Sequence, residues 1–202
     1  MQNITFDLST LHEHGSAFFD YLKLRKRFFV DRLKWDIPHN ENYEMDQYDN
    51  PTAHYSLCVH AGKVLGGTRV MPTTSTWGSH TYMLRDAHHG KLCGIPSEAM
   101  PSEIESPYVW EMSRLVISDE LTTHEQRARC LSLIGDGLYR IAEQQDCREF
   151  MGISSVALIR ALRQLGFPLD QAGEPYSDPD DGRKYTVMRM PVVHQTMQIA
   201  AE

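Results

Sequence analysis

The chain has 202 residues, of which 27 are acidic and 20 basic, so its formal net charge is −7 with neutral histidines. This excess of acid leaves no broad positive surface, and we expect no nucleic-acid partner. No segment approaches the roughly 20 apolar residues of a membrane-spanning helix, so no membrane span is expected. The length suits one domain that buries a core without disulfides or structural metal. We therefore predict a single domain over residues 1–202, with a loose tail over 194–202.

Cysteine and histidine spacing argues against disulfides and metal sites. The four cysteines lie far apart and form no Cys-x-x-Cys pair. No apolar segment that resembles a secretory signal precedes them, so we expect reduced thiols and a cytoplasmic protein. The ten histidines show no spacing typical of zinc ligands, and no metal site is expected.

The first half of the chain predicts helix, loop and hairpin in that order. Apolar residues recur at helical intervals between Gly15 and Trp35, which indicates one or two amphipathic helices. Residues 37–51 are polar and rich in Asn and Pro, which favours a loop. Residues 54–60 and 64–71 contain many strand-forming side chains around the turn Ala61-Gly62-Lys63, and together they predict a β-hairpin.

The second half predicts two surface loops and then alternating strands and helices. The loops are expected over 73–80 and 90–107, where Thr, Ser, Gly and Pro are frequent. The later elements are a strand over 108–117, a helix from Thr122 or Thr123 to about 145, a strand over 148–153, a helix from Ser154 or Ser155 through 165 and a strand over 185–193. This order predicts an α/β (α+β) fold with a mixed central β-sheet flanked by helices.

Two charges, Glu111 and Arg114, interrupt the otherwise apolar strand predicted over 108–117. A buried ion without a partner costs several kcal/mol, so these side chains need opposite charges or a chemical role. Asp46 and Asp49 in the 37–51 loop, with Arg69 in the hairpin, supply such charges and predict a five-member cluster of alternating sign. Alternate residues of a regular strand face opposite ways, so Glu111 and Arg114 require a bulge or divided roles. A purely structural ion-pair network is the alternative for Asp46, Asp49 and Arg69.

Five motifs follow one another between Arg25 and Arg114. They are Arg25-x-x-x-Phe29-x-x-x-x-x-Trp35, Glu44-Met45-Asp46-Gln47-Tyr48-Asp49, Arg69-Val70-Met71-Pro72-Thr73, Tyr82-Met83-Leu84 and Trp110-Glu111-Met112-Ser113-Arg114. In this order they resemble the acyl-homoserine-lactone synthases, the family that makes quorum-sensing autoinducers. The family hallmark positions filled here are Arg25, Phe29, Trp35, Asp46, Asp49, Arg69, Glu111 and Arg114.

The resemblance implies an acetyltransferase-like N-acyltransferase fold and a two-step reaction. An acyl chain passes from acyl carrier protein to the amine of S-adenosylmethionine, and lactone closure then releases methylthioadenosine. S-Adenosylmethionine is a substrate here, so no cofactor is implied. Glu111, Arg69 and Arg114 are implied as catalytic residues, with Glu111 as the general base for the amine.

Substrate-binding roles follow from the same resemblance. Asp46 and Asp49 are expected to neutralise the cationic groups of S-adenosylmethionine, and Arg69 to bind its carboxylate. Phe29 and Trp35 are suited to cover the adenine or the sulfonium, although their periodicity alone also fits a core position. Arg25 is expected to bind substrate or to order the loop.

The acyl chain requires an apolar tunnel, for which the later half of the chain offers candidates. The predicted acyl pocket is formed by Met112, Met151, Gly152, Ile153 and Val156, with Leu133, Ala157 and Leu162 as further apolar candidates. Gly152 stands where members selective for 3-oxo chains often carry Thr, which favours an unsubstituted chain. The family pattern is also interrupted by extra residues over Ser75 to Thr81.

An acidic carrier protein needs a basic patch on this acidic chain. The candidates, which equally fit a solvated helix face, are Arg140, Arg148, Arg160, Arg163, Arg183 and Lys184. Two other functions stay open at this point. One is an N-acyltransferase of the same fold that acts on a different amine, and the other is a non-catalytic acyl-ligand binding module.

Overall fold

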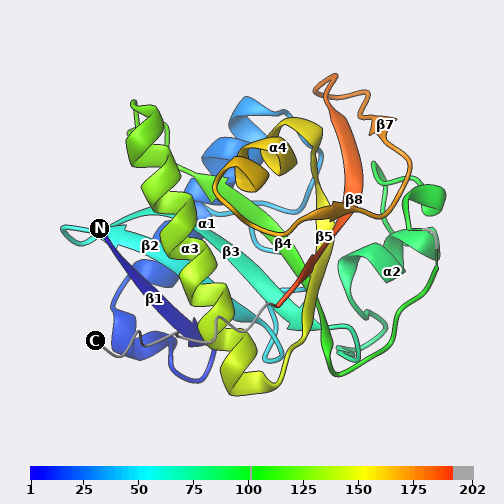
Figure 1. Cartoon of the computed structure of the whole chain (residues 1–202), viewed down its shortest axis with the longest axis horizontal. Coiled ribbons are helices and arrows are strands. Elements are labelled where there is room, and N and C mark those ends of the chain that lie inside the picture. Colours follow the sequence, from blue (N-terminus) through cyan, green and yellow to red (C-terminus); the bar gives the residue numbers. More distant parts are fainter. Residues whose placement is uncertain (101, 193–202) are drawn as a thin grey trace, which may run out of the picture.

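The centre of the protein is one mixed sheet of eight strands (Figure 1). The structure is a computed structural model that describes residues 1–100 and 102–192, so the tail expected over 194–202 lies outside the described residues. The strands are β1 (Gln2–Asp7), β2 (His54–His60), β3 (Lys63–Pro72), β4 (Val109–Ile117), β5 (Glu149–Ser155), β6 (Asp170–Gln171), β7 (Tyr176–Ser177) and β8 (Lys184–Pro191). Their order in the sheet is β1-β2-β3-β4-β5-β8-β6, and β7 pairs with β8 beside this path.

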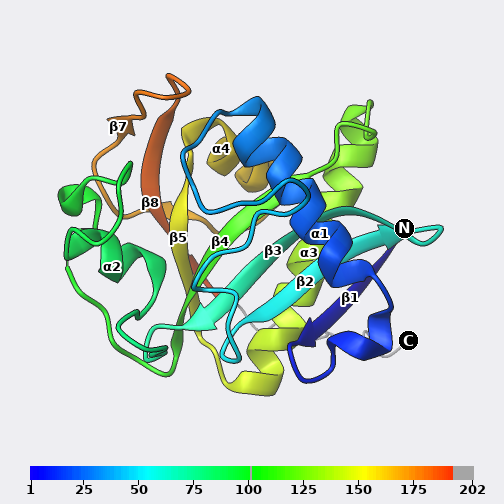
Figure 2. The same ribbon diagram turned by 180° about the vertical axis from the view of Figure 1, so that it is seen from behind.

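Helices cover both faces of the sheet (Figures 1 and 2). One face carries α1 (Ala17–Arg25), the π-helical η2 (Lys26–Arg32) and the short α2 (Met83–His88), and the other carries α3 (His124–Gln145) and α4 (Val156–Gln164). Two 3-10 turns, η1 (Leu11–His14) and η3 (Ser97–Ala99), complete the elements of the described chain. The predicted α/β (α+β) class is confirmed.

Local sequence signals explain where α3 and α4 begin. The Thr123 hydroxyl accepts the backbone N–H of Gln126 at 3.1 Å, while the Gln126 side chain accepts the N–H of Thr123 at 3.3 Å. This reciprocal capping box satisfies two N–H groups that have no partner inside the helix. Ser155 caps α4 in a simpler way, because its hydroxyl accepts the N–H of Leu158 at 3.2 Å. Both predicted caps are confirmed.

Several short or irregular features were absent from the sequence prediction, among them β1, α2 and the π-helical winding of η2. β1 is an edge strand that buries only Phe6, so its apolar alternation is weak. α2 has six residues and is too short to show helical periodicity. η2 continues α1 in a wider π-helical winding, which an apolar pattern does not distinguish from an α-helix. Among the described residues, no helix combines the length and the apolar character needed to cross a bilayer.

A bulge in β4 turns Arg114 away from a regular strand position. Gly67 pairs with Val116 and Arg69 pairs with Ser113, so two residues of β4 face Thr68 alone. Arg114 takes up the extra length with a φ of 56°, a left-handed conformation that few side chains adopt. The bulge expected between the two strand charges is therefore confirmed.

The two central strands separate soon after they meet. β4 and β5 are parallel, and their register covers only Val109–Glu111 against Glu149–Met151. Beyond this point β5 pairs only with β8. At the point of separation, a Cβ added to Gly152 would lie 2.2 Å from the carbonyl oxygen of Met112. The bare glycine backbone thus permits the close approach from which the strands diverge.

Gly152→Ala should therefore force the two strands apart. We expect the free energy of unfolding to fall by about 3 kcal/mol, because a backbone carbonyl cannot move aside as a side chain can. Urea denaturation measures this change.

Gly78→Ala is the matched control. Its φ is +60° and an added Cβ would meet nothing within 4 Å, so only conformational strain of about 1 kcal/mol is expected. Equal losses in the two variants would contradict the steric explanation.

Candidate active site

Six buried charges form a closed ring in which each acid bridges two arginines. The members in ring order are Arg25, Glu44, Arg114, Asp46, Arg69 and Asp49. The shortest N···O distance of each pair lies between 2.5 and 3.2 Å. Three positive and three negative charges cancel, so the formal charge of this ion-pair ring is zero.

The ion-pair ring is almost completely shielded from water. Its side chains are 0–8% exposed, and Arg114 is the most exposed member. Burial alone raises the pKa of Asp49, but the guanidinium groups of Arg69 and Arg25 outweigh it and hold this pKa well below its usual range. The pKa of Asp46 is also lowered, against its burial, by Arg69 and Arg114. Asp46 and Asp49 therefore remain charged at neutral pH.

Each arginine of the ring also lies over an aromatic side chain. The guanidinium carbon of Arg25 is 5.3 Å from the ring centroid of Tyr21, and that of Arg69 is 5.6 Å from Tyr48. The corresponding distance from Arg114 to Phe29 is 5.5 Å. Such faces stabilise a cation that has lost its hydration. The ion-pair ring is thus held by apolar neighbours as well as by its acids.

The predicted five-member cluster is corrected by this geometry. Glu111 is not part of the ion-pair ring, and its place is taken by Glu44, while Arg25 closes the circle. Glu44 belongs to the motif that contains Asp46 and Asp49, and its backbone N–H donates to the carbonyl of Leu22 at 3.3 Å. The acidic repeat in that motif was the available signal, and only the fold shows that its first acid is equally buried.

The roles expected in substrate binding for Arg25, Asp49 and Arg69 stay predictions. Their side chains are 0% exposed and their charged atoms are occupied by one another and by ring partners. Asp46 is 2% exposed and pairs with Arg69 and Arg114. These contacts form the ion-pair network that was the alternative for Asp46, Asp49 and Arg69.

Glu111 holds the first turn of α2. Its two carboxylate oxygens accept the backbone N–H groups of Met83 at 2.8 Å and Leu84 at 2.7 Å. Burial raises the pKa of Glu111 to about 7, although these two amides lower it. The side chain is fully buried and lines no described cavity. The role of Glu111 as a general base stays a prediction.

A cavity of about 400 Å³, called the site cavity, borders the ion-pair ring. Aromatic rings form much of its wall and three carboxylates contribute to its lining, whereas Met83, Ser113 and Arg114 connect it to the ring. These residues are Phe29, Trp35, Tyr176, Tyr185, Asp36, Asp178, Asp180, Met83, Ser113 and Arg114. Phe29 and Trp35 are stacked with centroids 5.0 Å apart and an interplanar angle of 23°. The two aromatic residues singled out in the sequence thus lie together at this cavity.

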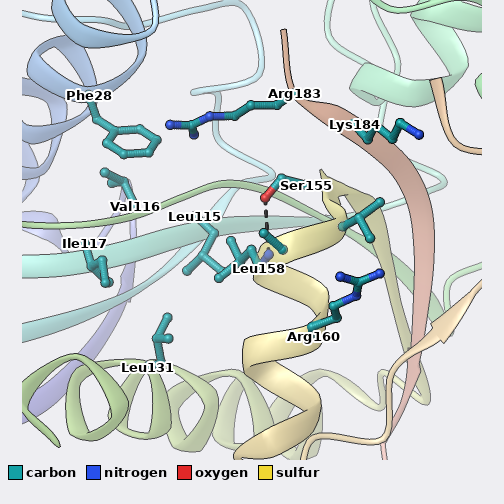
Figure 3. Close-up of a pocket in the computed structure, with 12 residues that line it drawn as sticks. Phe28, Leu115, Val116, Ile117, Leu131, Ser155, Leu158, Arg160, Arg183 and Lys184 are labelled. Atoms are coloured by element: carbon teal, nitrogen blue, oxygen red, sulfur yellow. Dashed lines mark hydrogen bonds between the residues drawn. The ribbon is translucent and has the colours of Figure 1, made fainter. Parts of the chain in front are cut away.

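A second hollow of about 640 Å³, called the α4 groove, opens beside the first turn of α4 (Figure 3). Its floor is apolar, and its basic side chains are Arg160, Arg183 and Lys184. Figure 3 shows Phe28 and Arg183 pointing toward one another across the groove. The residues shared by the α4 groove and the site cavity are Phe28, Leu115, Ser155, Leu158 and Arg183. The two hollows are therefore neighbours, separated by a few side chains.

The predicted acyl pocket is divided among different places. Ile153 lines the site cavity and Val156 lines the α4 groove. Met112 faces a small apolar hollow between β4, α3 and α4, and Met151 packs in the cluster that contains Met83. Gly152 lines none of these hollows and instead allows the close approach of β4 and β5. Leu115, which the sequence prediction omitted, lines all three hollows.

The predicted basic patch is also split. Arg160, Arg183 and Lys184 gather at the α4 groove. Arg163 donates to the carbonyl of Leu169 at 2.7 Å. Arg140 bonds to Asn3 at the far edge of the sheet, and Arg148 lies over the Tyr108 ring. The sequence does not separate these two groups, because the residues that meet at the α4 groove come from α4 and from the start of β8.

The structure offers no ready metal site in the part of the chain that it describes. No group of three or more His, Cys, Asp or Glu side chains is placed to hold an ion there. The acids near the site are either paired with arginines in the ion-pair ring or spread around the site cavity.

Comparisons with known proteins agree with this geometry. A family model described as autoinducer synthase matches residues 9–198. The chain belongs to the autoinducer synthase family. An acyl-homoserine-lactone synthase of Acinetobacter nosocomialis is 30% identical over 160 residues, which cover 75% of this chain and 80% of that protein. Another, from Vibrio anguillarum, is 28% identical over 155 residues and covers 76% of this chain and 75% of the relative.

Several solved structures are also similar to this chain. TofI, in a ternary complex with an inhibitor and MTA, has a TM-score of 0.74 and 26% identity, with 97% of this chain and 94% of that chain covered. BjaI, a CoA-dependent acyl-homoserine lactone synthase solved with SAM and isopentyl-CoA, has a TM-score of 0.75 at 16% identity. The match covers 96% of this chain and 84% of the BjaI chain. An acyl-CoA N-acyltransferase from Pseudomonas aeruginosa has a TM-score of 0.56 at 14% identity, and the match covers 93% of this chain and 97% of that chain. The last two show the fold alone, and the predicted N-acyltransferase fold is confirmed.

Arg25→Met tests how much the ion-pair ring contributes to the stability of the fold. The change leaves Glu44 and Asp49 buried with one arginine each, so we expect the free energy of unfolding to fall by about 3–5 kcal/mol. Chemical denaturation at neutral pH measures the loss.

Arg32→Met is the control, because Arg32 pairs with Asp119 at 2.6 Å on the exposed surface. Its expected loss is at most about 1 kcal/mol. A loss of the same size for Arg25→Met would show that the ion-pair ring contributes little.

Glu111→Gln tests the buried carboxyl group through pH. The pKa of Glu111 is raised from 4.5 to about 7 in the folded protein, so the folded state binds this proton more tightly than the unfolded chain. Its contribution to stability is complete below pH 4.5 and is lost as the pH rises through 7. The unfolding free energy of the wild type minus that of the variant should therefore fall by on the order of 3 kcal/mol over this interval. Urea titrations at several pH values measure it, and a constant difference would contradict the shift.

Proposed function

We propose that this protein is an acyl-homoserine-lactone synthase that acylates the amine of S-adenosylmethionine and closes the lactone with release of methylthioadenosine. The observation that carries the proposal is the site cavity itself, which combines stacked aromatic residues and carboxylates beside a neutral ion-pair ring. Family membership supplies the reaction class, and the cavity supplies a fitting place for a cationic, aromatic substrate.

Charge complementarity assigns one hollow to each substrate. S-Adenosylmethionine carries a sulfonium, an ammonium and an adenine, which match the carboxylates and aromatic rings of the site cavity. The acyl donor carries a phosphorylated arm, which matches the basic side chains of the α4 groove. The side chains shared by both hollows, Leu115, Ser155 and Leu158 among them, lie where the thioester and the amine would meet.

The acyl donor is proposed to be an acyl carrier protein. Carrier proteins are acidic, and the three basic side chains at the α4 groove provide a local positive surface on a chain of net charge −7. A coenzyme A thioester has phosphates of its own and is the competing donor. Docking of a whole acidic protein should depend more strongly on salt than binding of a small thioester.

The protein's part in the reaction is largely orientation. With the acyl arm in the α4 groove and S-adenosylmethionine in the site cavity, the amine faces the thioester carbonyl, and the thiol leaves as the amide forms. The substrate's carboxylate then displaces methylthioadenosine from its own γ carbon. Holding both groups in a reactive arrangement supplies several kcal/mol of barrier lowering. Glu111 is proposed to support this arrangement by fixing Met83 at the cavity wall.

One assay tests the reaction and separates it from the alternatives. Purified protein is incubated with S-adenosylmethionine and acyl carrier proteins of several chain lengths, and free thiol and methylthioadenosine are followed together. Equal release of both is expected. Thiol release only with another amine would indicate a different N-acyltransferase, and release of neither would indicate a binding module. The same chains presented on coenzyme A test the donor, and we expect lower kcat/KM for them.

Arg160→Glu tests the place of the donor. Reversing this charge at the α4 groove should raise the KM for the acyl carrier protein by about tenfold and leave the KM for S-adenosylmethionine unchanged. Arg129→Glu is the control, because Arg129 is exposed on α3 and does not line the groove. Equal effects of the two substitutions would reject the α4 groove as the docking place.

A further inference from the structure

Trp35 bonds to the C-terminal hairpin, which consists of β7, β8 and the turn over residues 178–183 between them. Its indole N–H donates to Oδ2 of Asp181 at 3.3 Å, across 146 positions of sequence. The Tyr185 hydroxyl donates to the same oxygen at 2.6 Å. The Trp35 and Tyr185 rings also lie edge to face, with centroids 5.8 Å apart. One carboxylate oxygen of Asp181 therefore connects two aromatic residues of the cavity wall.

Asp181 is held by its own turn and does not depend on Trp35 for its position. Its other oxygen, Oδ1, accepts the backbone N–H of Arg183 at 2.9 Å. The turn itself is fixed by Asp178, whose side chain accepts the backbone N–H groups of Asp180 at 2.9 Å and Asp181 at 3.2 Å. The carboxylate is thus a preformed acceptor to which the indole N–H attaches.

Stacking and hydrogen bonding fix different motions of the Trp35 ring. The stack on Phe29, at 5.0 Å and 23°, sets the plane of the indole. Rotation within that plane and sliding over Phe29 keep the stack, so another contact must prevent them. The bond from the indole N–H to Asp181 does so. Because Phe29 covers one face of Trp35, the opposite face is the one left for a ligand in the site cavity.

We propose that Asp181 is a positioning residue that holds the Trp35 ring at the angle needed to bind the sulfonium substrate. A cation binds best over the face of an indole, so its affinity depends on the direction of that face. When the indole N–H donates to a carboxylate, the indole ring also becomes more electron-rich. The inference rests on the proposed function, because it takes S-adenosylmethionine as the ligand of the site cavity.

Fluorine NMR reports the environment of the Trp35 side chain in the protein without added ligand. The chain has three tryptophans, so protein labelled with fluorotryptophan gives three resonances, and Trp35→Phe identifies the one from Trp35. In Asp181→Ala this resonance should shift and broaden while those of Trp77 and Trp110 stay in place. An unchanged Trp35 resonance would overturn the inference.

A double-mutant cycle then relates the position of the Trp35 indole to the affinity for S-adenosylmethionine. Asp181→Ala should weaken S-adenosylmethionine binding, measured by calorimetry, by about tenfold, the order expected for a hydrogen bond to a charged group. Trp35→Phe keeps the stack but removes the N–H and should give a similar loss. The double variant should bind no more weakly than Trp35→Phe alone, because Asp181 acts through the indole. Losses that multiply in the double variant would overturn the inference.

A matched variant separates positioning from general damage. Glu174→Ala, which removes an exposed acid before β7, should match the wild type in its affinity for S-adenosylmethionine. Failure of the wild type to bind S-adenosylmethionine would contradict the proposed function itself. Normal wild-type binding with an unchanged affinity in Asp181→Ala would reject only the positioning role.

Discussion

The buried ion-pair ring is the constraint on which the site depends, because it fixes the loop of residues 44–49 to α1, β3 and β4. Arg25 comes from the end of α1, Arg69 from β3 and Arg114 from the bulge of β4, and the acids come from the loop before β2. Desolvating six charges is costly, and the closed alternation offsets this cost by giving each charge two partners of opposite sign. The loop of residues 44–49 therefore has one permitted position against the sheet.

The ion-pair ring also explains how the site cavity obtains its shape. Arg114 is both a ring member and a cavity residue, and its guanidinium lies over Phe29, on which Trp35 stacks. Trp35 in turn bonds to Asp181 in the C-terminal hairpin. A continuous series of contacts thus runs from the buried charges through two aromatic rings to the C-terminal hairpin. In this account the ionic motif shapes the substrate site from behind and leaves direct contact to the aromatic and acidic lining.

Local signals predicted most of the fold, whereas the roles within the site required three-dimensional information. Capping residues such as Thr123 and Ser155 act within one turn, so the starts of α3 and α4 were correct. The motif resemblance, in turn, brought the right residues to one region. It did not distinguish Glu44 from Glu111, because both are acids near strands, and only the fold decides which one faces the arginines. The Asp181 contact with Trp35 lacks any local pattern, since it spans 146 positions.

A crystal structure of the protein with S-adenosylmethionine would test the central claim most directly. The account predicts the ligand in the site cavity, with its cationic centre against Trp35 and the cavity carboxylates, and with every ion pair of the ring preserved. A ligand whose carboxylate displaces Asp46 from Arg69, or whose ammonium takes Asp49 from Arg25, would contradict the account, because the ring would then bind substrate directly.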